Sequence, residues 1–184
     1  MLILLPPSEK KLQTKAPTPA INVYVGVLYQ ALNWSSLSVA AKKRAEKSLI
    51  IISAKYRAIS PLEKIETYKE KIDNKLMAPR VSQLLDKVKT NLIVDCRSST
   101  YKTVWHAPEE LTVEIHVSTV VDGERKVVTH MSKKTRGEIA RFLLQARSIP
   151  NSPEDLYAIV SETYPCALTP PTHNEPWILE VIAV

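Results

Sequence analysis

The stretch HMSKKTRGEIARFLL, residues 130–144, gathers positive charge around a glycine. Its cations are Lys133, Lys134, Arg136 and Arg141. Thr135 and Glu138 fit the S/T-x-x-E capping box, so we expect a helix to begin at Thr135 with Gly137 in its first turn. A helix N-terminus presents free N–H groups and the positive end of the helix dipole. The stretch therefore predicts a phosphate site, and the alternative is a capped surface helix with solvated lysines.

Polar side chains also follow three short apolar runs at residues 2–5, 49–52 and 92–94. Continuous apolar runs of this length are typical of strands that are buried on both faces. In open α/β sheets, ligands bind at the carboxyl ends of the parallel strands. If the three strands are parallel, we expect the side chains that follow them to converge. They are Lys10 or Lys11, Ser53, Tyr56, Asp95, Arg97, Ser98 and Tyr101. The alternative is a set of unconnected polar loops.

The chain carries none of the common catalytic signatures, such as GxSxG, a Walker A loop, HExxH or GxGxxG. Its four histidines show no metal-ligand spacing, and we predict neither a metal nor a cofactor. In an enzyme, Asp95 would be the candidate acid–base group, with Lys11 and Lys133 stabilising charge. A two-residue turn at 122–123 would place His130 beside Ile115 on the apolar face of a hairpin, as a core histidine or as a proton carrier.

The elements that would position these residues alternate between strands and helices. We expect helices over 23–32, 38–47, 81–88, 135–146 and about 152–160, with residues 59–78 partly helical. Ser38 is the expected N-cap of the second helix, and the apolar face of the third is Leu84, Leu85 and Val88. Alternating apolar residues and Asp122-Gly123 predict a hairpin over 111–129, and a last strand is expected over 178–184. The pattern predicts a single α/β domain over residues 1–184. It has a mixed, mostly parallel sheet with a β-hairpin, helices packed around it, and a basic cleft at the carboxyl ends of the strands.

Charge is unevenly distributed along the 184 residues. The net charge is +6, with +5 in each of the segments 40–71 and 124–147, and residues 148–184 hold five acids and no Lys or Arg. Basic segments indicate an anionic partner, and a solvated surface is the alternative. The sequence shows no apolar run long enough to span a membrane and no targeting signal, so we expect a cytoplasmic monomer. Its two cysteines, Cys96 and Cys166, are expected to be reduced thiols.

In five stretches the chain resembles the YaaA family of peroxide-stress proteins. They are MLILLPPSEKK at the start, VYVGVLYQAL at 23–32, SAKYRAISPLEKIETYK at 53–69, VDCRSSTYKTVW at 94–105, and HMSKKTRGEIARFLL. The resemblance implies one α/β domain of unusual topology with a basic cleft, DNA binding, and a role in limiting peroxide damage through free intracellular iron. Residues on the family's motif positions are Lys11, Ser53, Tyr68, Asp95, Ser98, Tyr101, Lys133, Lys134, Arg136 and Gly137. Among these, Asp95, Lys11 and Tyr68 are the catalytic candidates.

The chain departs from the family pattern near its start. Lys10 stands where members carry glycine, and Arg57 replaces another glycine. Residues 12–22 join the first two motifs where the family has several helices, including a helix-hairpin-helix element that is credited with DNA contact. Two functions follow as hypotheses: a stress protein that binds DNA through its basic segments, or an enzyme or binder of a nucleotide-like, phosphorylated molecule.

Overall fold

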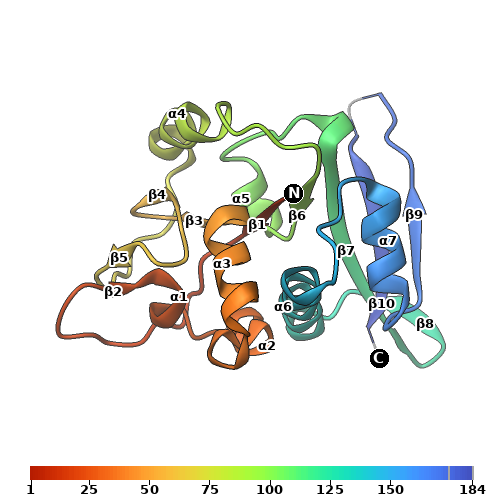
Figure 1. Cartoon of the computed structure of the whole chain (residues 1–184), viewed down its shortest axis with the longest axis horizontal. Coiled ribbons are helices and arrows are strands. Elements are labelled where there is room, and N and C mark those ends of the chain that lie inside the picture. The colour runs from red at the N-terminus through yellow and green to blue at the C-terminus, as the bar shows by residue number, and fades with distance from the viewer. Residues whose placement is uncertain (174, 184) are drawn as a thin grey trace.

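The computed structural model describes residues 1–173 and 175–183. The strands of its main sheet are β1 (Leu2–Leu5), β3 (Leu49–Ser53), β4 (Arg57–Ile59), β6 (Ile93–Asp95), β7 (Thr112–Val121), β8 (Glu124–Lys126), β9 (Cys166–Thr169) and β10 (Trp177–Ala183). Their order is β4-β3-β1-β6-β7-β10-β9, with β8 paired to β7 (Figure 1). Neighbours from β3 to β10 are parallel, whereas β4, β8 and β9 each pair antiparallel with a neighbour. The predicted mixed, mostly parallel sheet with a β-hairpin is confirmed.

Helices cover both faces of this sheet. They are α1 (Ala20–Val23), α2 (Val27–Leu32), α3 (Val39–Ser48), α4 (Asn74–Leu85), α5 (Ser99–Lys102), α6 (Thr129–Gln145) and α7 (Pro153–Ser161), and a small ribbon of β2 (Thr18–Pro19) and β5 (Lys64–Ile65) lies at one end. Successive side chains of a strand point to opposite faces, so β1 contributes to two cores. Ile3 and Leu5 pack with residues of α2, α3, α6 and α7, whereas Leu2 and Leu4 pack with α4.

Two predicted helices have different bounds in the structure. The expected helix over 23–32 is divided into α1 and α2, because residues 24 and 25 pair with Lys10 and Lys11 of the first loop. The helix expected over 81–88 is α4, which begins after Asp73, whose carboxylate accepts the N–H of Leu76. Its buried face is Met77, Val81 and Leu85, so the predicted face of Leu84, Leu85 and Val88 is wrong in two of its three positions. The bounds of the helices expected over 38–47 and about 152–160, and Ser38 as N-cap, are confirmed within about two residues.

The predicted start of the basic helix is also wrong. Helix α6 begins at Thr129, and Thr135 is buried inside it, so the capping box does not form. Gly137 therefore lies in the middle of the helix, where a Cβ would stand 2.1 Å from the carbonyl oxygen of Leu28. The missing side chain lets α2 pack directly against the backbone of α6. His130 lies in the first turn of α6 and is exposed, so its predicted place on the face of the hairpin is wrong as well.

Strand β7 has a gap along one of its edges. Strand β6 pairs with residues 112–114, and β8 pairs with residues 119–121 after the predicted two-residue turn, in which Asp122 and Gly123 both have positive φ. Thr119 pairs with both β8 and β10, so β8 lies on the same edge of β7 as β6. Residues 115–118 are thus left without a strand partner on that edge. This gap lies beside the candidate functional site.

The final strand predicted over 178–184 is β10, and residue 184 lies outside the described residues.

Candidate functional site

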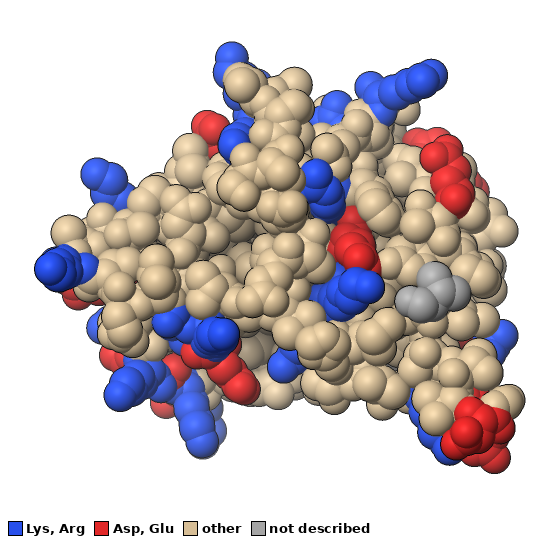
Figure 2. Space-filling model, turned by 90° about the horizontal axis from the view of Figure 1, so that it is seen from below, with Lys and Arg blue, Asp and Glu red and all other residues tan. Residues whose placement is uncertain are grey.

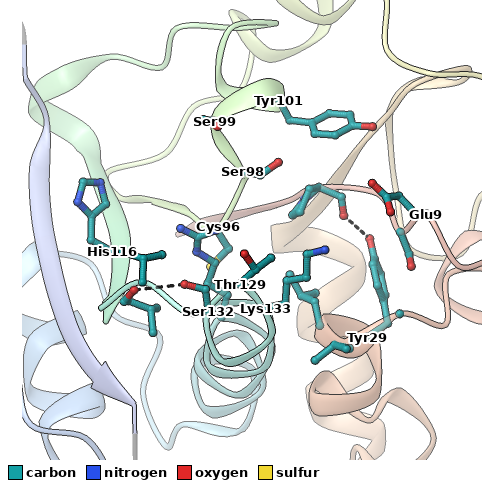
Figure 3. A pocket seen from close by; sticks show the side chains of 18 of the residues that line it. Glu9, Tyr29, Cys96, Ser98, Ser99, Tyr101, His116, Thr129, Ser132 and Lys133 are labelled. Atoms are coloured by element: carbon teal, nitrogen blue, oxygen red, sulfur yellow. Dashed lines mark hydrogen bonds between the residues drawn. The ribbon is translucent and has the colours of Figure 1, made fainter. Parts of the chain in front are cut away.

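A cavity of about 950 Å³ opens at the carboxyl ends of β1 and β6, beside the gap in β7 (Figure 3). Its lining comes from the loop after β1, the start of α2, the turn around α5 and the first two turns of α6, together with residues of β7, β8 and β10. Lining residues from these segments include Glu9, Lys10, Tyr29, Ser98, Tyr101, Thr129, Ser132, Lys133 and Arg136. The sequence predicts a site at this edge of the sheet, and the structure places a cavity there.

Helix α6 supplies the cationic wall of the cavity. Ser132 donates a hydrogen bond to the carbonyl of Val117, and Arg136 donates two to the carbonyl of Ile115 (3.0 and 3.2 Å). Both carbonyls belong to the open edge of β7, so these side chains fasten the start of α6 to the gap. Lys133 extends from the same helix into the space between Tyr29 and Ser98 (Figure 3). The N-cap of α6 has no side-chain hydrogen bond, which leaves the positive end of its dipole available beside the cavity.

The opposite wall comes from the loop after β1 and from α5. The hydroxyl of Tyr29 donates to the carbonyl of Pro6 (2.7 Å), which holds this loop against α2. Glu9, Lys10, Ser98 and Tyr101 follow on this side. Burial raises the pKa of Tyr101 to about 12, so its hydroxyl remains a proton donor at neutral pH.

The cavity wall carries more positive than negative charge. Its cations are Lys10, Lys102, Arg125, Lys133 and Arg136, and its carboxylates are Glu9 and Glu180. Lys102 pairs with Glu114 and Arg125 pairs with Glu180, whereas the other three cations make no salt bridge within the described ranges. Viewed from the side of the strand carboxyl ends, Lys and Arg stand in separate groups, with uncharged surface and some acidic side chains between them (Figure 2).

A carboxylate that the sequence analysis did not single out organises the β7 side of the cavity. Glu114 accepts a hydrogen bond from Lys102 (2.5 Å) and is joined to Nε2 of His116 (2.9 Å). These bonds, that from His116 foremost, lower the pKa of Glu114 to about 2. Both Lys102 and His116 line the cavity. The signal in the sequence is that Glu114 and His116 are two residues apart on a strand, so they share the face opposite the apolar Val113 and Ile115.

Glu114 is expected to stabilise the protein above pH 4.5, the ordinary pKa of its side chain, and to lose this effect as the pH falls towards 2. The folded-state pKa is the lower one, so protons favour the unfolded chain across this window. After allowance for partial exposure, the contribution is about 1–2 kcal/mol. Unfolding by urea at pH 6 and at pH 2 measures it: Glu114→Gln should be less stable than the wild type at pH 6 and equally stable at pH 2. If Glu114→Gln is less stable than the wild type by the same amount at both pH values, the predicted contribution of the ionised carboxylate is contradicted.

Two predicted site residues pair with each other instead of lining the cavity. Asp95 and Arg97 are each 2% exposed, and their side chains form a bidentate ion pair at 2.8 and 2.9 Å. Arg97 also donates to the carbonyls of Tyr101 and Trp105. The pair therefore holds the turn that carries Ser98 and Tyr101, and neither side chain is among those that line the cavity.

A second polar cluster lies beside the cavity, beneath the loop after β1. The hydroxyl of Tyr68 is 2.8 Å from those of both Ser53 and Tyr24, and all three residues are buried. The amine of Lys11 lies 4.2 Å from the centre of the Tyr68 ring, and the ring of Tyr56 meets Tyr68 edge-on. Burial lowers the pKa of Lys11. The structure thus brings these predicted residues together, and places them outside the lining of the cavity.

The remaining predicted residues of α6 make contacts within the fold. Lys134 pairs with Glu138 (3.7 Å), and Arg141 donates to the carbonyls of Leu32 and Asn33 at the end of α2. Gly137 is covered by Leu28. Of the predicted cations of this helix, Lys133 and Arg136 line the cavity.

Comparison with known proteins finds a family whose model covers most of the chain. A family model described as "Peroxide stress protein YaaA" matches residues 7–167. This chain belongs to that family. A UPF0246 protein of Streptomyces coelicolor is 32% identical over 185 residues, which cover 94% of this chain and 71% of the relative. A UPF0246 protein of Corynebacterium glutamicum is 32% identical over 187 residues, covering 95% and 74%, and one of Ruegeria pomeroyi is 28% identical over 149 residues, covering 70% and 57%.

Burial affects both thiols of this peroxide stress family member. Both cysteines are free, and burial raises the pKa of Cys96, on the cavity floor, to about 12. Burial also raises the pKa of Cys166. The reactive form of a cysteine is its thiolate, and burial disfavours that form at both positions.

Two further features of this YaaA family chain concern metal ions and membranes. Over residues 1–173 and 175–183, no group of three or more His, Cys, Asp or Glu side chains lies close enough together to hold a metal ion. Within the same ranges, the helices are too short or too polar to cross a bilayer.

Proposed function

We propose that this member of the YaaA family acts in the peroxide stress response by binding a phosphate-bearing ligand of nucleotide size in the cavity. The observation that carries the proposal is the convergence of Lys10, Lys133 and Arg136, without carboxylate partners in the described part of the chain, on one space of about 950 Å³. Hydroxyls of Ser98 and Tyr101 face the same space. Pockets of this size enclose small molecules, and a few convergent polar groups fix their orientation.

The start of α6 supports an anion as the ligand. Its first-turn N–H groups have no side-chain cap, and Lys133 and Arg136 are three residues apart, so they lie on the same side of the helix. A phosphate placed there would meet both the helix dipole and two cationic side chains.

DNA is the second candidate ligand. It is favoured by the net charge of +5 in each of the segments 40–71 and 124–147. A duplex requires a track of phosphate contacts, and its affinity falls steeply with salt. On the carboxyl-end face of this molecule the cations stand in separate groups (Figure 2), which fits a small ligand better than a long track.

Lys133→Ala is expected to weaken binding of ADP or inorganic pyrophosphate by about tenfold, because a charge-assisted hydrogen bond is lost. Lys134→Ala is the matched control: the neighbouring lysine pairs with Glu138 and does not line the cavity, so a change below about twofold is expected. Isothermal titration calorimetry measures both. Equal losses in the two variants would contradict a site in the cavity. DNA would be favoured if only a labelled duplex binds, if its affinity falls steeply with salt, and if both variants weaken that affinity equally.

A further inference from the structure

One wall of the cavity carries a histidine whose orientation is set by a carboxylate. Nε2 of His116 lies 2.9 Å from Oε2 of Glu114. An ionised carboxylate can only accept hydrogen bonds, so Nε2 must carry the proton of this bond. The second ring nitrogen, Nδ1, is then the one left for a ligand. His116 lines the cavity and its side chain is 45% exposed, so it can exchange protons with solvent.

The protonation state of His116 decides whether it repels or attracts an anion. In the neutral ring, Nε2 holds the proton and Nδ1 presents a lone pair, which repels an anionic oxygen. In the imidazolium, both nitrogens are donors, and the ring adds a positive charge to the cavity. The bond to Glu114 excludes the other neutral form, in which Nδ1 would carry the proton.

Charged groups of both signs surround this ring. Glu114 lies on the same strand, and Glu180 of β10 is the register partner of His116. Both carboxylates favour the imidazolium, although each is already paired, with Lys102 of α5 and Arg125 of β8 respectively. Lys133 and Arg136 of α6 line the same cavity and disfavour a further positive charge. A dianion bound near these cations would offset their charge and shift the balance towards the imidazolium.

We propose that His116 takes up a proton when a dianionic phosphate group enters the cavity, and so makes ligand binding proton-coupled. This inference rests on the proposed function. It assigns His116 as a ligand contact and Glu114 as the residue that positions its ring. Affinity should therefore rise as the pH falls through the range in which imidazoles titrate.

Inorganic sulfate is the probe that isolates this effect, because it remains a dianion from pH 5.5 to 8, whereas phosphate changes its own charge. Titration calorimetry or NMR titration at constant ionic strength, balanced with chloride, gives the affinity at each pH. We expect wild-type affinity to be about tenfold higher at pH 5.5 than at pH 8, as one added positive charge near a dianion would produce. Over this range Glu114 stays ionised, since its pKa is about 2. In His116→Asn the dependence on pH should disappear.

His130→Asn is the matched control, because His130 is exposed on the first turn of α6 and does not line the cavity. It should retain the pH dependence. If His116→Asn retains the dependence, or His130→Asn abolishes it, the assignment to His116 is overturned. If wild-type protein binds sulfate equally at all pH values, this inference fails and the proposed function stands. If it binds no sulfate at any pH, both fail.

Discussion

Gly137→Ala is expected to destabilise the protein by about 3 kcal/mol or more, although alanine alone would favour the helix by about 1 kcal/mol. A Cβ at this position would lie 2.1 Å from the carbonyl oxygen of Leu28 and 2.9 Å from the Cβ of Ala31. A backbone carbonyl inside α2 cannot rotate away, so the two helices would have to separate. Because α2 carries Tyr29, the cavity wall would move as well. Urea unfolding followed by circular dichroism measures the loss of stability.

Gly26→Ala is the matched control for this prediction. A Cβ there would lie 2.2 Å from Oγ of Ser8, which is the end of a side chain that can rotate. The backbone of Gly26 is extended and accepts any residue. We therefore expect a change within about 1 kcal/mol. Equal losses in the two variants would contradict the close approach of α2 to α6 as the reason for the glycine at position 137.

Asp95→Asn is expected to destabilise the protein by about 3–5 kcal/mol, because it leaves the buried guanidinium of Arg97 without its counter-ion. The pair is 2% exposed on both sides, and Arg97 fastens the carbonyls of Tyr101 and Trp105. Removing one charge is costlier than removing both. The double variant Asp95→Leu/Arg97→Met should therefore lose less stability than the summed losses of Asp95→Leu and Arg97→Met. A double-mutant cycle from urea unfolding measures this coupling.

The same variant separates a structural role of Asp95 from a role in ligand binding. We expect folded Asp95→Asn, at a temperature well below its unfolding transition, to bind pyrophosphate within about threefold of the wild type, because the side chain does not line the cavity. Lys133→Ala should show the opposite pattern, with weaker binding and nearly unchanged stability. A loss of binding in Asp95→Asn that exceeds its loss of folded protein would restore Asp95 as a candidate acid–base group.

Features that depend on local interactions could be predicted from the sequence. Continuous apolar runs identified β1, β3 and β6, since a strand buried on both faces needs apolar side chains in both directions. Ser38 and Asp122-Gly123 identified a helix start and a tight turn through their own backbone preferences. The ordered motifs identified the family, and the strand ends identified the edge at which the cavity opens.

Which of the polar residues face one another depends on contacts between distant segments and could be seen only in the folded chain. Thr135 and Glu138 satisfy a local capping pattern, but α6 begins at Thr129 and Thr135 is buried within the helix. Gly137 lets α2, more than a hundred residues earlier in the chain, pack against α6, and no local sequence pattern predicts that contact. Asp95 and Arg97 pair with each other in the core, whereas Lys133, Arg136 and His116 line the cavity beside the gap that β6 and β8 leave on the edge of β7. Contacts between distant segments depend on strand pairing and packing, which single-residue preferences do not specify.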